Sequence, residues 1–361
     1  MEIWLQGFTR RFLQDGRFER WIRDHGIRGA VQDAALLHRA MAENGDYDEA
    51  VAAGTLRGTA PDRVIEEAAL DDARRAADFL RGVHDRSGGR SGLVTLDPPR
   101  RIELDPEAAA RRAEELVEAA GRPNVLAALP AFEPLLPAIA ILVERGVPLN
   151  VTHITSLSRY RMVTEAWMSG LERRLGRGLD AGGAGFFATI HLEPIDRQVQ
   201  PGLDALVGAR EKVAEGKDLE GRAAVSTACM AHRAAAGLVR EDERFLTLSR
   251  AGGVMHTLVW GALPAVAERA EPLLRELASP YVVATVPHEV LGRIEIPKGS
   301  GIEEGMDEAD RTLRRLEVDG IPMERIAREL DREAVGRWTE GYDRLRATAE
   351  EMAERLAPRG A

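Results

Sequence analysis

Short runs rich in β-branched and aromatic residues alternate with long stretches of helical period along most of this chain. This alternation predicts a parallel sheet whose strands are connected by helices. Eight such runs suit a closed (β/α)8 TIM barrel, whereas an open, doubly wound sheet is the structural alternative. The first run lacks the glycine-rich turn of a dinucleotide site, which favours the barrel. The expected strands begin at Ile3, Gly29, Gly92, Val125, Leu149, Gly185, Gly253 and Tyr281.

A helical pattern continues beyond the last expected strand, from Met323 to Leu356. Its apolar spacing predicts one or two amphipathic helices that pack across the barrel or its rim. No linker is rich enough in Pro, Gly or Ser to divide the chain. We therefore expect a single barrel domain over residues 1–361, with C-terminal helices at 320–358.

Composition narrows the function classes. The formal net charge is −10, with acidic and basic residues interspersed, which argues against nucleic-acid partners. There is no run of about 18 uncharged apolar residues and no signal-peptide pattern, so we predict a cytoplasmic protein without a membrane partner. The single cysteine, Cys229, is expected to be a small core residue.

Several segments, in order, resemble the transaldolase family of the bacterial type. IWLQGFTR resembles LWLDxLSR, VTLDPP resembles VSLEVSP, and LNVTHITSLSRYRMVTEAWMSGLE resembles INVTLIFSLERYxxVxEAYxxGLE. YVVATVPHEVL resembles DTVNTMPxxTL near the end of the barrel. The resemblance covers nearly the whole chain and implies the family's barrel fold, while a shared fold says much less about chemistry.

The resemblance also implies a mechanism in which a strand-four lysine forms a Schiff base with a ketose carbonyl. In this chain Ala128 takes that position, and alanine cannot form an imine. Other matched positions also differ from the family pattern: Gln6, Asp33, Asp97, Phe132, Gly185, Ile190 and Gly261. Matched positions that are retained are Asn150, Thr152, Ser156 and Trp260. The only lysines, Lys212, Lys217 and Lys298, are expected on the surface.

Alternation along the strands predicts which side chains face the barrel axis. From this parity and the resemblance we expect substrate contacts from Gln6, Thr95, Ala128, Asn150, Thr152, Ser156, Phe187, Ile190 and Trp260. Ala128, Phe132 and Ile190 would make the wall apolar, and the arginine replaced at Ile190 would remove a phosphate clamp. These features predict a small-molecule substrate that is not phosphorylated, and larger or more apolar than a sugar phosphate.

Asp33 and Asp97 are expected at the ends of adjacent strands. Two close carboxylates can share a proton, which makes an acid/base pair the catalytic prediction. A purely structural role, and a divalent ion bound together with Asn150, remain alternatives. We predict no cofactor and no metal.

The histidines give weaker signals. His153 is out of phase with Asn150 and Thr152, so it is expected to face the helices. His191 and Glu193 follow strand six and could line a pocket, although a solvated loop is favoured. His256 is expected to pack in the core. Trp260 could form a hydrophobic wall or simply pack.

Three functions remain open at this point. The first is a lysine-independent enzyme for proton transfer, elimination or rearrangement of a specialised metabolite. The second is a non-catalytic homologue that acts as a binding or assembly partner, and the third is a transaldolase with a relocated lysine. A homodimer or a partner enzyme is compatible with each.

Overall fold

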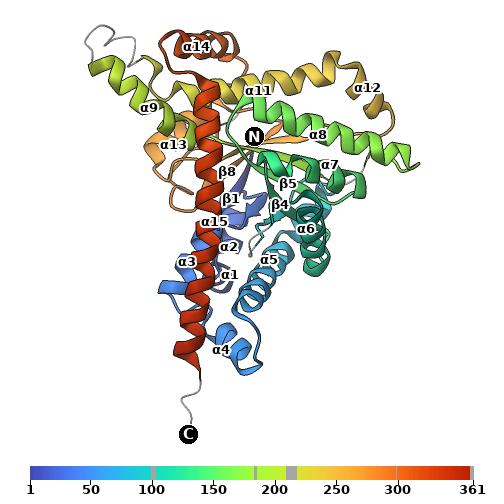
Figure 1. The fold of residues 1–361 in the computed structure, drawn as a ribbon, viewed down its shortest axis with the longest axis vertical. Coiled ribbons are helices and arrows are strands. Elements are labelled where there is room, and N and C mark those ends of the chain that lie inside the picture. The colour runs from blue at the N-terminus through green and yellow to red at the C-terminus, as the bar shows by residue number, and fades with distance from the viewer. Residues whose placement is uncertain (99–102, 183–184, 209–217, 298, 358–361) are drawn as a thin grey trace.

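The barrel is closed in a computed structural model that describes residues 1–98, 103–182, 185–208, 218–297 and 299–357. Eight parallel strands pair in chain order, and β8 pairs back to β1 (Figure 1). The strands are β1 (Glu2–Gln6), β2 (Gly29–Val31), β3 (Leu93–Leu96), β4 (Val125–Pro130), β5 (Leu149–Ile154), β6 (Phe186–His191), β7 (Thr257–Gly261) and β8 (Val282–Pro287). The predicted (β/α)8 class and all eight predicted strands are confirmed.

Helices surround the barrel because each strand buries one face against them and the other inside the ring. The helices between β1 and β4 are α1 (Arg10–Gln14), α2 (Arg17–Asp24), α3 (Ala34–Glu43), α4 (Asp48–Leu56), α5 (Pro61–Arg86) and α6 (Pro106–Ala120). Those between β4 and β7 are the 3-10 turn η1 (Glu133–Leu135), α7 (Leu136–Arg145), α8 (Leu157–Gly176), α9 (Glu193–Gly208), α11 (Arg222–Glu241) and α12 (Glu243–Arg250). The last are α13 (Ala267–Glu276), α14 (Met306–Val318) and α15 (Met323–Leu356).

The interior of the barrel is filled at its lower level by apolar side chains. Trp4, Leu93, Leu126, Phe187, Val259 and Val283 form one buried cluster there. Gly29 lies directly against the Trp4 indole, and a Cβ at this position would come within 2.6 Å of the ring. The barrel interior is therefore filled at this level, and room for a substrate is expected at the carboxyl ends of the strands.

The C-terminal segment is one continuous helix, α15. It begins after Pro322 and buries a stripe of side chains that includes Ile326, Trp338 and Leu345. It contacts α3, α4, α5 and α9, and it runs lengthwise past the barrel to the far end at α4 (Figure 1). The predicted C-terminal amphipathic helix is confirmed. No helix among the described residues is both long and apolar enough to span a bilayer.

The strand β5 is irregular near its end. Its pairing with β6 shifts register between Val151 and Ile154, and His153 has a φ of 60°. Val151 and Ile154 both pack in the apolar layer outside the ring, so the two residues between them share the opposite side. A local bulge of this kind re-aims side chains and is common beside active sites.

Candidate functional site

A cavity of about 500 Å³ opens where the strands end, which is where enzymes with this fold hold their substrates. Its size suits a small metabolite. The strand residues that line it are Gln6, Val31, Ala128, Asn150, Thr152, His153, Thr189, His191, Gly261 and Thr285. The helix α15 closes one side with Ala334, Arg337, Trp338, Gly341, Tyr342 and Arg344. Strands and the last helix therefore build the site together.

Asp33 and Asp97 both line the cavity, as the sequence predicted. Asp33 caps α3, and one of its carboxylate oxygens accepts a hydrogen bond from the backbone N–H of Leu36 at 2.8 Å. Burial, and then the charge of Asp33, raises the pKa of Asp97 to about 7, while a hydrogen bond from the backbone of Ala34 opposes the rise. Two carboxyl groups in different environments are the usual arrangement of an acid/base pair.

Two residues that line the same cavity carry buried polar atoms without a partner among the described residues. The Tyr342 side chain is 5% exposed, and its hydroxyl makes no hydrogen bond of good geometry with any described residue. Burial, and then the charge of Asp97, raises the pKa of Tyr342, which places the phenol near that carboxyl group. The Oε1 atom of Gln6 is likewise buried without a partner in the described part of the chain. The sequence did not identify Tyr342 as a site residue, because a tyrosine in an amphipathic helix is usually a packing residue.

The floor of the cavity is a closed hydrogen-bond network. The Asn150 amide donates to the Thr95 hydroxyl at 3.2 Å, and the Thr189 hydroxyl donates to the Asn150 carbonyl oxygen at 2.6 Å. Asn150 lines the cavity, whereas the fully buried Thr95 lies outside its lining. Both ends of the amide are thus occupied, which argues for a structural role rather than a metal ligand. Within the described ranges no group of three or more His, Cys, Asp or Glu could hold a metal ion.

His153 lies in the cavity, so the expectation that it faces the helices is wrong. Strict alternation would have turned it outward, but the bulge in β5 places Thr152 and His153 on the same side. The Thr152 hydroxyl lies 2.9 Å from His153 Nδ1. A left-handed backbone is costly for a side chain other than glycine, and such strain persists where the surroundings enforce it.

His191 is the last residue of β6 and also lines the cavity, so the solvated loop that we favoured is wrong. Its ring centroid is 4.6 Å from that of His153, and its Nε2 accepts a hydrogen bond from the His153 backbone N–H at 3.4 Å. Burial lowers the pKa of His191 to about 4, with a smaller contribution from the charge of Arg337. Burial, His191 and Arg337 lower the pKa of His153 as well. Both imidazoles are therefore neutral at pH 7.

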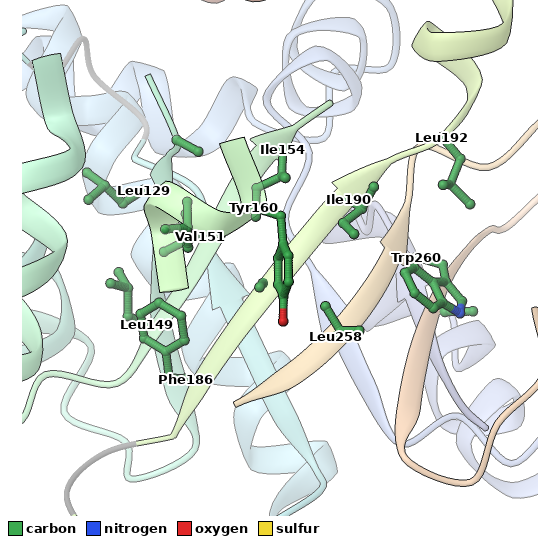
Figure 2. Packing of buried hydrophobic residues seen from close by; sticks show 14 of the residues in the cluster. Leu129, Leu149, Val151, Ile154, Tyr160, Phe186, Ile190, Leu192, Leu258 and Trp260 are labelled. Atoms are coloured by element: carbon green, nitrogen blue, oxygen red, sulfur yellow. The ribbon is translucent and has the colours of Figure 1, made fainter. Parts of the chain in front are cut away.

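Five residues expected to touch substrate lie elsewhere. Thr95 is fully buried, and parity explains two of the other four. Thr189, His191 and Gly261 face the cavity, so Ile190 and Trp260 must face the helices. Figure 2 shows both within the buried hydrophobic packing, beside Leu258. The expected apolar wall at Ile190 is therefore wrong.

The other two lie below and beside the cavity. Phe187 fills the barrel at the level of Trp4, with ring centroids 5.0 Å apart. Ser156 caps α8, and its hydroxyl accepts a hydrogen bond from the backbone N–H of Arg159 at 3.1 Å. The remaining expected contacts, Gln6, Ala128, Asn150 and Thr152, do line the cavity.

The mouth of the cavity carries positive charge. Arg197 from α9 and Arg337 and Arg344 from α15 line it, and His38 from α3 is hydrogen-bonded there to Thr348 at 3.1 Å. The sequence did not reveal these arginines as site residues, because the helices that carry them are rich in charge throughout. The wall is consequently more polar than the strand residues alone suggested.

Two core predictions are confirmed away from the cavity. Cys229 is buried, and burial raises the pKa of its thiol to about 11. His256 is buried just before β7, where its Nε2 lies 2.9 Å from the Tyr160 hydroxyl. Neither residue has a place in the candidate site.

Replacing Trp260 by phenylalanine is expected to destabilise the barrel by about 1–2 kcal/mol without changing ligand binding. The indole is 0% exposed and donates a hydrogen bond to the Leu277 carbonyl at 3.1 Å, which phenylalanine cannot replace. Urea unfolding and ligand titration of the same preparation measure the two effects. A weakened ligand affinity with unchanged stability would instead make Trp260 a wall of the pocket.

None of the described residues that line the cavity is a lysine. Lys212, Lys217 and Lys298, which we expected on the surface, lie outside the described residues.

Comparison with known proteins connects this geometry to a family. The model of the family described as transaldolase/fructose-6-phosphate aldolase matches residues 3–349. Transaldolase 1 of Streptomyces coelicolor is 30% identical over 352 residues, which are 96% of this chain and 91% of that protein. Transaldolase 2 of the same organism is 29% identical, with 99% of this chain and 95% of that protein covered. The transaldolase of Saccharopolyspora erythraea is 27% identical, with 98% and 95% covered.

Proposed function

This chain belongs to the transaldolase/fructose-6-phosphate aldolase family, and from that premise we propose that it catalyses acid/base chemistry that does not depend on a lysine. The reaction is a proton transfer, elimination or rearrangement of a small metabolite bound in the cavity. Asp97 and Asp33 are its acid and base. No cofactor or metal takes part in this proposal.

The observation that carries the proposal is the carboxyl pair at the ends of β2 and β3. A carboxyl group whose pKa is raised to about 7 exchanges protons readily at neutral pH, which is the property required of a general acid or base. Asp33 accepts a hydrogen bond from the Leu36 backbone N–H, which holds its carboxyl group in position. The pair thus contains one group with a raised pKa and a second carboxyl group that lines the same cavity.

Ala128 supports the lysine-independent part. It lines the cavity from β4, at the position where the resemblance places the Schiff-base lysine. Its methyl group offers no nucleophile, and its small size leaves room for substrate beside it. The electron sink that an iminium would supply must then come from hydrogen-bond donors in the wall.

The cavity wall favours a more polar substrate than the sequence indicated. Phosphorylated substrates were disfavoured because of Ile190, which does not reach the cavity. Arg197, Arg337 and Arg344 at the mouth favour a polar or anionic substrate over an apolar one. We propose an unphosphorylated specialised metabolite as the substrate, and phosphate esters serve as the comparison.

The test measures exchange of carbon-bound protons in D2O by NMR, which needs no knowledge of the final product. A panel of short aldehydes and ketones, each with a hydroxyl, carboxylate or phosphate substituent, is incubated with the full chain. We expect loss of the signal of the proton next to the carbonyl group for at least one class. If no member exchanges faster than in buffer, the acid/base proposal fails, and a binding or assembly role, with a second copy or a partner enzyme, takes its place.

An ordinary transaldolase is the second candidate, favoured by the names of the relatives. It requires an amine within reach of the substrate, and the chain has only three lysines. Borohydride reduction in the presence of fructose 6-phosphate is expected to leave the mass of the protein unchanged, because Ala128 cannot form an imine. A reduced adduct on Lys212, Lys217 or Lys298 in the peptide map would establish the second candidate instead.

A further inference from the structure

The proposed acid/base chemistry needs a hydrogen-bond donor in the cavity as well as a base. Removing a proton next to a carbonyl group moves an electron pair onto the carbonyl oxygen, and that oxygen needs a hydrogen-bond donor. Asp33 follows β2, and β6 lies four strands away in the closed ring of eight. His191, at the end of β6, therefore faces Asp33 across the mouth of the barrel.

The hydrogen bonds of His191 determine which of its nitrogens carries the proton. Its Nε2 accepts from the His153 backbone N–H, so Nε2 is unprotonated and the neutral ring carries its proton on Nδ1. No described residue accepts a hydrogen bond from Nδ1, and this atom is not among the buried polar atoms without partners. The Nδ1–H group is consequently a donor that is open to the cavity.

The protein enforces this arrangement at a cost. The His153 backbone N–H reaches the ring because β5 bulges and His153 adopts a φ of 60°. Among the described residues other than glycine, only His153 and Ala262 have positive φ values, and both line this cavity. The Thr152 hydroxyl, 2.9 Å from His153 Nδ1, holds the second ring in place. Strain concentrated at one cavity indicates that the geometry there serves function.

We infer that His191 is a further catalytic residue, whose neutral Nδ1–H donates a hydrogen bond to the carbonyl oxygen of an enolisable aldehyde or ketone. This inference rests on the proposed function and names its substrate class. Asp33 or Asp97 takes the proton from the carbon next to the carbonyl, and the C–H electron pair forms the C=C bond. The carbonyl π pair moves to the oxygen, where the His191 N–H holds it, and return of the proton to carbon completes the exchange.

The electrostatics agree with a donor that stays neutral. Burial, and then the charge of Arg337, lowers the pKa of His191, so the ring does not become a cation at pH 7. His153 is a positioning residue in this scheme, because its backbone fixes the tautomer and its ring packs against His191.

The experiment compares the proton-exchange rate of the full chain with that of His191→Ala and His191→Gln. We expect a loss of roughly 10²-fold for His191→Ala, the effect of removing one such donor. Partial recovery is expected in His191→Gln, whose amide can still donate. His232→Gln is the matched control, because His232 is a partly buried histidine in α11, outside the cavity lining. The inference would be overturned if His191→Ala exchanged protons at a rate within threefold of the unmodified chain while Asp97→Asn abolished exchange. That result would leave the proposed function standing.

A binding measurement tests the donor even if no exchange is found. Acetohydroxamate is a planar mimic of the enolised intermediate, and it is titrated into the full chain with ¹⁵N-labelled histidine. We expect the His191 Nδ1 proton to move downfield on binding, and this signal to be missing in His191→Gln. Saturable binding without any change at the His191 ring, or no binding at all, would refute the donor role.

Discussion

Asparagine in place of Asp97 is expected to lower the proton-exchange rate by at least about 10²-fold, because the amide cannot take up or release the proton. The structure places this carboxyl group in the cavity, where burial and Asp33 raise its pKa to about 7. Exchange rates measured by NMR for the unmodified chain and for Asp97→Asn give the ratio. Asp310→Asn, at a partly exposed aspartate of α14 that pairs with Arg314 outside the cavity lining, is the control.

The same substitution has a predictable effect on stability. The pKa of Asp97 is 3.8 in an unperturbed chain and about 7 in the fold, so the folded state binds the proton more tightly. This contribution to stability is complete below pH 4 and is lost as the pH rises to about 7. The difference of roughly three pKa units corresponds to at most about 4 kcal/mol. Asp97→Asn should therefore be more stable than the unmodified chain at pH 8.5 and gain little at pH 4.

Urea unfolding at these two pH values measures the effect. Asp310→Asn should show no comparable pH-dependent gain. An Asp97→Asn variant that is destabilised equally at both pH values would show that the carboxyl group is ionised and well solvated in the fold. That result would remove the main support for its acid/base role.

Alanine in place of Asp72 is expected to destabilise the protein by about 3–5 kcal/mol, because it removes the only fully buried counter-ion that the described residues offer Arg10. Arg10 Nε lies 2.9 Å from one carboxylate oxygen of Asp72, and the Tyr47 hydroxyl donates to the other at 2.7 Å. This buried network ties α1 and α4 to the long helix α5. Chemical denaturation measures the loss, and the cavity itself contains none of these residues.

Asp71 provides a matched control one residue away. It also contacts Arg10, at 3.4 Å, but its side chain is 41% exposed. Solvent screening limits such a pair to less than about 1 kcal/mol. If Asp71→Ala and Asp72→Ala lower the stability equally, the buried network does not hold these helices together as we describe.

The alternation of strand and helix patterns in the sequence was sufficient to predict the fold. Each of the eight expected strands is present, and β7 differs most, since it begins at Thr257 rather than Gly253. Strands and helices have different hydrophobic periods, so local patterns reveal them even without contacts. The same periodicity placed Asp33 and Asp97 together, because parallel neighbours end at the same edge of the sheet.

Side-chain direction was predictable only where the strands stay regular. Ile190 and Trp260 were expected in the cavity because they match family positions. Their neighbours Thr189 and Gly261 face the cavity instead, so alternation turns Ile190 and Trp260 toward the helices. For His153 the alternation rule gave the wrong direction, because the strand bulges there and no local sequence pattern indicates a bulge. These differences explain why the wall of the cavity is more polar than expected.

By itself the sequence determined the barrel, the order of its strands and the carboxyl pair at their ends, because these depend on hydrophobic period and chain order. Only the tertiary structure decided which histidines enter the cavity, and that Tyr342 and the arginines of α15 and α9 enclose it. Such contacts join residues far apart in the chain, and they depend on a local bulge and on how one long helix packs. Neither leaves a periodic trace in the sequence.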